Sequence, residues 1–349
     1  MPSDHSNGTS KFDQAKLGQL DLESTNTDNT RPSFDPKRLP SEKLIDAIYS
    51  LEYDAEQVQA IIQEALSRSS LYIFDRAREM IVHSNSSIRY VGAEILGNFG
   101  VEVELGAGMD NMKGEAKSRS FLERSRRQAL ATMIECFQSE TDPEVVAALI
   151  AGLGRNCATH EIDRVCEYAS HSNVSIREAV AFALPTMLEP SSFESKSETA
   201  ANHYKKVKEI LISLADDAQE VVREWALFGL AEILGGDDIE IINCLKNHLN
   251  EPNDDLRAEC AYGLAVRGDD GCESVLAELL VKKLDPRTQR LTIEAALQCA
   301  RAAFVGPLEK ALEIYDSSAE PETSQDDIGP SREDILKALE FCRQEPLSK

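Results

Sequence analysis

A leucine recurs six times in one local sequence frame, and this repeat constrains the fold more than any other feature of the chain. The spacing is roughly 31 to 34 residues, with two longer intervals, and an arginine stands seven residues before five of the six leucines. The leucines are Leu96, Leu153, Leu184, Leu230, Leu264 and Leu297, and the arginines are Arg89, Arg177, Arg223, Arg257 and Arg290. Such self-similarity is typical of stacked helices, so we predict an all-α, right-handed α-solenoid.

The residues around each leucine explain why the frame is helical. The positions four and eight residues earlier are mostly apolar, which gives an i, i+4, i+8 stripe on one helical face. Glycine or alanine stands directly before the leucine in five frames, at Gly152, Ala183, Gly229, Gly263 and Ala296. A glycine inside a helix costs about 1 kcal/mol, so this recurrence predicts close helix packing. Four stripes follow a residue suited to a helix N-cap: Asn85, Asp142, Asn173 and Asn253.

Four short segments share a further pattern at the start of the predicted helices. They are Asp142-Pro143-Glu144-Val145, Ser175-Ile176-Arg177-Glu178-Ala179, Val222-Arg223-Glu224 and Leu256-Arg257-Ala258-Glu259. The pattern resembles the HEAT repeats, specifically the short bacterial type of phycobilisome-lyase-like proteins, over about residues 70 to 300. The resemblance implies stacked antiparallel helix pairs of the HEAT/armadillo-like kind. It implies little about function, because such repeats serve scaffolds, adaptors, chaperone-like lyases and a few enzymes.

The remaining segments predict the domain organisation. Residues 1–39 are polar with few apolar side chains, which predicts a disordered tail. Residues 40–345 are expected to form a single solenoid, beginning with helices capped by Ser41 and Asp54. Insertions at about 101–120 and 189–197 account for the two longer intervals between leucines.

Composition limits the classes of partner. A formal net charge of -24 repels phosphate backbones, so general nucleic-acid binding is not expected and a basic protein partner is favoured. Alternatively, the charge serves only solubility. No apolar run reaches the roughly 20 residues of a membrane span, and the N-terminus has no hydrophobic signal segment, so we expect a soluble cytoplasmic protein. The eight cysteines lack C-x-x-C spacing, which favours reduced core thiols.

Aromatic residues stand two positions before the leucine in three consecutive frames, at Phe182, Phe228 and Tyr262. On a helical wheel this position points about 150° away from the apolar stripe, which predicts a row of rings along the concave groove of the solenoid. Alternatively, curvature buries these rings between neighbouring helices. Trp225 lies at the margin of the stripe and is expected to be partly buried. With nearby acids, the predicted partner-binding residues are Phe182, Glu224, Trp225, Phe228, Glu259 and Tyr262.

A second candidate surface is locally basic. Between residues 111 and 127 only Glu115 and Glu123 oppose its positive charges, which are Lys113, Lys117, Arg119, Arg124, Arg126 and Arg127. This patch could dock an acidic partner segment, or it is simply a solvated loop. The five repeated arginines are instead expected to form ion pairs between stacked repeats.

The sequence offers no constellation typical of catalysis. Cys157, His160, Cys166 and His171 are zinc-ligand types without the paired spacing of a zinc site, and Cys166 follows the apolar rhythm of a core position. HEAT-repeat di-iron hydroxylases combine several His-Glu pairs, whereas only His160-Glu161 is present here. The basic groove of HEAT-like DNA glycosylases is also missing. We therefore expect no metal and no cofactor.

These observations predict a non-catalytic scaffold or adaptor that holds a partner, in particular a basic protein or segment, in an acidic, aromatic-lined groove. A toxin-neutralising immunity protein is one member of this class. The alternative is a phycobilin lyase-like or chaperone-like HEAT protein acting on a chromophore or a protein substrate.

Overall fold

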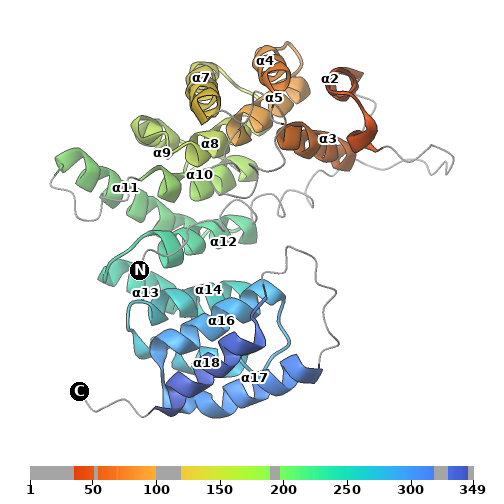
Figure 1. The fold of residues 1–349 in the computed structure, drawn as a ribbon. Helices are drawn as coiled ribbons and strands as arrows, with labels where there is room; N and C mark the ends of the chain where they lie inside the picture. The colour runs from red at the N-terminus through yellow and green to blue at the C-terminus, as the bar shows by residue number, and fades with distance from the viewer. Residues whose placement is uncertain are drawn as a thin grey trace. The chain divides into compact units, whose positions relative to one another are not determined.

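The computed structural model describes residues 35–50, 54–68, 70–99, 119–188, 197–317 and 329–344 (Figure 1). All regular secondary structure within these residues is helical, which confirms the predicted all-α class. The contacts between residues divide the chain into two compact units. The boundary along the chain lies between Val207 and Lys208, inside helix α11. Each unit is described separately below.

The first unit consists of helix pairs, in which α2 packs on α3, α4 on α5, α7 on α8, and α9 on α10. The second helices of these pairs form a row, because α5 contacts both α3 and α8, and α8 contacts α10. We call this the second-helix row. The bounds are α2 (Ser41–Ser50), α3 (Ala55–Arg68), α4 (Leu71–Met80), α5 (Ser86–Asn98), α7 (Arg119–Phe137), α8 (Pro143–Arg155), α9 (Ile162–Cys166), α10 (Val174–Met187) and α11 (Glu198–Ala215).

The second unit repeats this plan. Its second-helix row runs from α12 through α14 and α16 to α18, while α13, α15 and α17 pack beside their successors. The helices are α12 (Glu220–Phe228), α13 (Ile239–Asn247), α14 (Asp254–Ala265), α15 (Glu273–Leu279), α16 (Pro286–Cys299), α17 (Val305–Ser317) and α18 (Arg332–Arg343). Shorter turns are the π-helical η6 (Gly229–Ile233) and the 3-10 turns η7 (His248–Asn250), η8 (Asp270–Cys272) and η9 (Ala302–Phe304).

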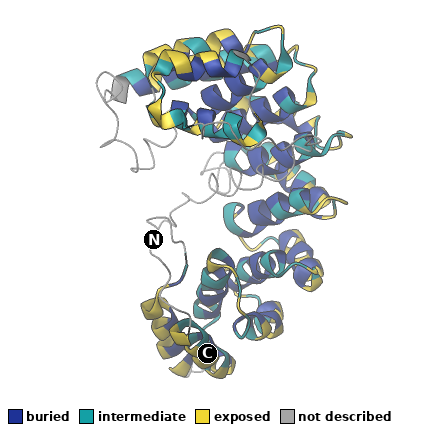
Figure 2. Cartoon of the chain, turned by 90° about the vertical axis from the view of Figure 1, so that its right-hand side faces the viewer, coloured by how far each residue is buried: buried dark blue, intermediate teal, exposed yellow. Residues whose placement is uncertain are grey.

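Five of the six repeated leucines lie on helices of the second-helix rows, and Leu230 lies in η6, directly after α12. The sides of these helices that face their neighbours are buried (dark blue in Figure 2). Five of the leucines have no exposed surface: Leu96, Leu153, Leu184, Leu230 and Leu264. Leu297 on α16 is partly exposed. The frame therefore marks the helices that contact their counterparts in the adjacent repeats.

Small residues allow the close helix packing that the sequence predicts. A Cβ atom added to Gly152 on α8 would lie 3.1 Å from Gly97 Cα on α5 and 2.9 Å from Met133 Sδ on α7. A Cβ atom added to Gly263 on α14 would lie 2.7 Å from Ala231 Cβ in η6. All three distances are shorter than ordinary van der Waals contacts, so a side chain at either glycine would force its neighbours to shift.

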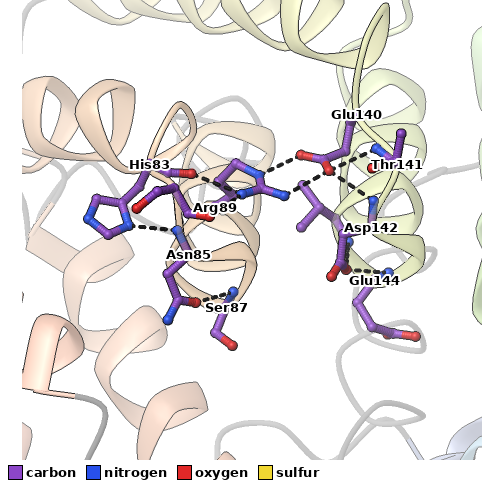
Figure 3. A network of polar contacts seen from close by, with 10 residues as sticks. His83, Asn85, Ser87, Arg89, Glu140, Thr141, Asp142 and Glu144 are labelled. Carbon is purple, nitrogen blue, oxygen red and sulfur yellow. Dashed lines mark hydrogen bonds and ion pairs between the residues drawn. The ribbon is translucent and has the colours of Figure 1, made fainter.

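A repeated polar turn precedes two of these helices. At the start of α5, the Asn85 side chain accepts a hydrogen bond from the backbone N–H of Ser87, and His83 Nδ1 accepts one from the backbone N–H of Asn85 (Figure 3). Arg89 donates to the carbonyl oxygens of His83 and Ser84 at 2.9 and 3.0 Å. The guanidinium thus satisfies carbonyl groups that the turn leaves without helical partners.

The same turn recurs before α10 with the same chemistry. His171 Nδ1 accepts from the backbone N–H of Asn173, whose side chain accepts from the N–H of Ile176. Arg177 donates to the carbonyl oxygens of His171 and Ser172 at 2.9 and 3.1 Å. Residues 83–89 and 171–177 are both of the form H-S-N-x-S-I-R, so one short sequence encodes the whole turn.

The repeated arginines also pair with acids, as predicted. Arg89 forms two hydrogen bonds with Glu140, which follows α7 in the next repeat, at 2.7 and 2.9 Å (Figure 3). In the second unit Arg223 pairs with Glu251 at 3.0 Å and Arg257 with Glu278 at 2.5 Å. Arg290 lies near Glu294 of its own helix at 3.9 Å. The predicted ion pairs between repeats are therefore confirmed for Arg89, Arg223 and Arg257.

Several predictions concern the segments between helices. Helix α7 begins at Arg119, at the end of the first predicted insertion, and α10 ends at Met187, just before the second one. Residues 35–39, assigned to the tail, include a 3-10 turn whose Pro36 carbonyl accepts a hydrogen bond from Arg68. The rest of the tail, residues 1–34, and most of both insertions lie outside the described residues. Among the helices that are described, none is long and apolar enough to cross a membrane.

Candidate binding surface

Most of the predicted partner-binding residues are buried. Phe182 is 3% exposed, Phe228 5% and Trp225 1%. Only Tyr262 of the three ring positions is partly exposed. Burial between helices, the alternative interpretation of the aromatic row, therefore describes Phe182 and Phe228, and Trp225 is more buried than expected. A helical wheel places these rings outward because it represents one helix alone, without the neighbouring helices that cover them.

An arginine lies over a phenylalanine ring in each unit. In the first unit, the Arg155 guanidinium at the end of α8 is 5.4 Å from the centre of the Phe182 ring on α10. In the second unit, the Arg287 guanidinium is 5.9 Å from the Phe228 ring, which in turn lies edge-on to Trp225. A cation over an aromatic face is attracted by the ring quadrupole, so these rings serve as internal contacts of their units.

Arg287 is the centre of the polar contacts of the second unit. Asp285 caps α16 and Pro286 occupies its first turn, which places Arg287 at the start of the helix. From there its Nη2 lies 3.2 Å from an oxygen of Glu232 in η6 and 3.2 Å from an oxygen of Glu259 on α14. One side chain therefore connects α16 with α14 and with η6, which directly follows α12.

The Arg287 contacts are largely shielded from water. The Arg287 side chain is 19% exposed, and Glu259 is 1% exposed. Burial disfavours the charge of Arg287, but Glu259 and Glu232 outweigh it and raise its pKa above the ordinary arginine value. The buried Glu259 carboxylate already pairs with this cation, so within the predicted set Glu224 and Tyr262 are the more accessible members.

A π-helical turn and Arg267 position Glu232. Single π turns inside helices recur at functional sites, and here η6 follows α12 directly and carries Glu232. Arg267 donates to the carbonyl oxygens of Ala231 at 3.1 Å and of Leu230 at 2.7 Å, and also to that of Leu234. These bonds satisfy the carbonyl groups at the irregular end of the segment. Neither residue type nor spacing predicted a π turn or this role for Arg267.

Carboxylates gather where α14 and α16 begin. The Thr288 hydroxyl donates to Asp255 Oδ1 at 2.6 Å, and Asp285 accepts from the backbone N–H groups of Arg287 and Thr288 at 3.0 and 3.2 Å. Burial, together with the charges of Asp285 and Glu224, raises the pKa of Asp255. Burial opposes the charge of Asp285 too, but hydrogen bonds from Thr288 lower its pKa.

Glu294 on α16 and Tyr262 on α14 also have raised pKa values. Burial and then the charge of Asp334 raise the pKa of Glu294, although Arg290 opposes them. Burial, followed by the charges of Glu232 and Glu294, raises the pKa of Tyr262. Burial is the largest cause of all three raised pKa values, those of Asp255, Tyr262 and Glu294, and the charges of neighbouring acids add to it. We call the set of residues linked by these interactions, on α12, η6, α14, α16 and α18 or at their starts, the acidic row. It comprises Glu224, Glu232, Asp255, Tyr262, Asp285, Arg287, Glu294 and Asp334.

The basic patch is only partly described. Lys113 and Lys117 lie outside the described residues, as does the side chain of Arg119. On α7, Arg124 and Arg127 are exposed. Arg126 Nε donates a hydrogen bond to Oδ1 of Asn156 at 3.4 Å, and Asn156 is the residue that directly follows α8.

The candidate zinc ligands differ in how far they are buried. Cys157 and His160 are exposed, whereas Cys166 is buried. In the part of the chain that the structure describes, no three His, Cys, Asp or Glu side chains are grouped to hold a metal ion. Burial raises the pKa of Cys166 to about 11 and that of Cys244 to about 12, as expected for inert core thiols.

Comparison with solved structures defines the fold. Escherichia coli YibA is 19% identical to the chain, with a TM-score of 0.55 over 88% of this chain and 94% of YibA. Yeast importin-β (Kap95p) is 12% identical, with a TM-score of 0.50 over 86% of this chain and 42% of importin-β. Both are HEAT-repeat proteins. The chain has a HEAT-like solenoid fold.

This HEAT-like fold is a similarity of structure rather than of sequence. No protein-family model matches the chain, and no curated protein matches it by sequence. The CpcE–CpcF complex of phycocyanin lyase from Nostoc also aligns, at 11% identity and a TM-score of 0.45, over 91% of this chain and all of the other. At these identities the comparisons establish the architecture, so function is argued from the residues of the HEAT-like chain itself.

Proposed function

We propose that the chain is a non-catalytic protein-binding scaffold and that the acidic row of its second unit binds a basic segment of a partner. The acidic neighbours of Asp255 and Glu294 support this proposal most directly. Burial is the main reason why the pKa values of these two carboxyls are raised, but the charges of Asp285, Glu224 and Asp334 add to it, and a nearby cation would offset that negative charge. The net charge of -24 favours the approach of the same class of partner.

The accessible residues define how such a segment would be held. Glu224 and Tyr262 are partly exposed, as are Asp255 and Glu294. A lysine or arginine side chain can pair with a carboxylate while its methylene groups pack against the tyrosine ring. Phe228 and Trp225 act from beneath as the support of this surface, because both are buried.

A titration with defined peptides tests the proposal. The full chain is titrated calorimetrically with a short lysine- and arginine-rich peptide and with the same peptide carrying glutamine at the basic positions. The basic peptide should bind and lose affinity as salt is added, because the contacts lie near the surface. Equal binding of the two peptides would contradict the proposal.

Variants locate the peptide on the acidic row. The double variant Glu224→Gln, Asp255→Asn should weaken binding about tenfold, corresponding to about 1.4 kcal/mol. The matched control is Glu313→Gln, which removes an exposed carboxylate from α17. Equal losses in both proteins would show a general effect of net charge. Tyr262→Ala is the suitable aromatic test, because truncating the buried Phe228 would itself destabilise the unit by about 3 kcal/mol.

A further inference from the structure

Two cysteines of the second unit lie side by side. Cys272 ends the turn η8 directly before α15, and Cys299 is the last residue of α16. Their Sγ atoms are 3.7 Å apart, a sulfur–sulfur contact between residues that are 27 positions apart in the chain. The other cysteines of the core, such as Cys244 and Cys260, are buried as single side chains of the apolar stripes. The pair therefore has an arrangement that core packing alone does not require.

The two thiols differ in access and in acidity. Cys272 has no exposed surface, whereas Cys299 is partly exposed. The hydrogen bond from Cys272 lowers the pKa of Cys299, and although burial opposes this, Arg301 adds to it. Arg301 is held in place by an ion pair with Asp270. The accessible member of the pair is thus the one that more readily becomes a thiolate, the reactive form of cysteine.

We propose that the Cys272–Cys299 pair is a site of reversible oxidation, at which hydrogen peroxide converts the two thiols into a disulfide. The Cys299 thiolate attacks one peroxide oxygen, the O–O bond breaks, and a sulfenic acid and hydroxide form. The sulfur of Cys272 then attacks the Cys299 sulfur, the S–O bond breaks, and the hydroxide and the Cys272 proton leave as water. Overall the two thiols lose two electrons and one peroxide becomes two water molecules.

The bond would fix the end of α16 to the start of α15. Ala300, directly after Cys299, adopts a left-handed backbone conformation with φ 46°, so α16 ends at the reactive cysteine. A disulfide there closes a loop containing all of α15 and α16 and restricts the unfolded chain. Oxidation should therefore raise the thermal unfolding midpoint of the full chain by several degrees, and a thiol reductant should reverse the shift.

Peptide mapping tests the assignment. The full chain is treated with hydrogen peroxide, digested without reduction and analysed by mass spectrometry. A peptide linked through Cys272 and Cys299 is expected. Oxidation of Cys157, the exposed cysteine, without this linked peptide would overturn the proposal, and so would linkage of either residue to Cys342.

Single-cysteine variants test the order of the steps. With Cys272→Ser, the Cys299 sulfenic acid has no thiol to resolve it and should be trapped by dimedone; with Cys299→Ser, Cys272 should remain unlabelled. Cys157→Ser should form the same linked peptide as the unsubstituted chain. Dimedone labelling of Cys272 in the Cys299→Ser protein would contradict the order. If the buried Cys272→Ser substitution prevents folding, Cys299→Ser and Cys157→Ser still decide the proposal, because only the former should abolish the peroxide-induced rise in the unfolding midpoint.

Discussion

Arg287 shows how much a single side chain contributes to the second unit. It lies over the Phe228 ring and reaches carboxylates on two other segments, Glu232 and Glu259. Its position after Asp285-Pro286 repeats the helix start seen at Asp142-Pro143, so the sequence contained a local signal for where it stands. Its partners lie 28 and 55 residues away, and only the packing of the repeats brings them together.

Removing Arg287 should destabilise the protein. Arg287→Ala withdraws the cation from the buried Glu259 carboxylate, and we expect the free energy of unfolding to fall by about 3 kcal/mol. Arg287→Lys keeps the positive charge but lacks the planar guanidinium with its several N–H donors, so it should have an intermediate effect. Urea denaturation measures both. Arg124→Ala on the exposed surface of α7 is the control and should change stability by less than about 0.5 kcal/mol.

At the scale of an element, the turn before α5 combines a helix cap with an ion pair to the next repeat. Arg89 binds carbonyl oxygens of its own turn and the Glu140 carboxylate. Glu140 also accepts hydrogen bonds from the backbone N–H groups of Thr141 and Asp142, so it organises the start of the following helix as well. Neighbouring second helices are thereby held in register through polar contacts as well as apolar ones.

The Arg89–Glu140 contact predicts a pH dependence of stability. Burial opposes the charge of Glu140, but Arg89 and the two backbone N–H groups lower its pKa below the ordinary value of 4.5. Below pH 4.5 the unfolded chain therefore binds protons more readily than the folded one, and the stabilisation present at neutral pH is lost as pH falls through the lowered folded pKa. Arg89→Gln should reduce stability at neutral pH and flatten its decline in acid.

Urea denaturation of the Arg89→Gln protein, from neutral pH to below pH 4.5, measures both effects. Arg124→Gln is the matched control, because Arg124 is an exposed arginine of the same unit. An identical acid decline in the two variants would show that Glu140 does not depend on Arg89.

At the scale of the whole molecule, each helix of a second-helix row contacts its neighbours within its own unit, and every one except α12 also packs on the helix that precedes it as its pair. Stability in such repeats is close to a sum of local terms, so a defect in one repeat should remain near that repeat. The two compact units offer a comparison within one chain.

Gly263→Ala tests this locality. The added Cβ would lie 2.9 Å from Ala231 Cα, and the strain should destabilise the second unit by about 2 kcal/mol. Amide hydrogen exchange should accelerate in α13 to α16 and stay unchanged in α4 and α5. Gly306→Ala is the matched control, because nothing lies within 4 Å of its Cβ position and alanine favours the α17 helix. Faster exchange throughout the chain would contradict the additive description.

How well the sequence predicts a structural feature of this protein depends on how far apart in the chain the interacting residues are. The leucine frame, the caps at Asn85 and Asp142 and the glycine at Gly152 follow from local chemistry, and the structure confirms them. The aromatic row was predicted to line the groove, whereas Phe182 and Phe228 are buried, because exposure depends on what the neighbouring helices cover. The repeated H-S-N-x-S-I-R turn was visible in the sequence, yet its role follows only from the contacts of Arg89 and Arg177.

The sequence by itself determined a stack of helices, since a repeat of apolar spacing, caps and small residues specifies each helix and the face by which it packs. Only the tertiary structure decided which polar groups meet. Arg287 with Glu232 and Glu259, Asp255 with Thr288, and Cys272 with Cys299 are pairs of residues far apart in the chain. Such pairs depend on where neighbouring repeats place their helix ends, and no local periodicity carries that information.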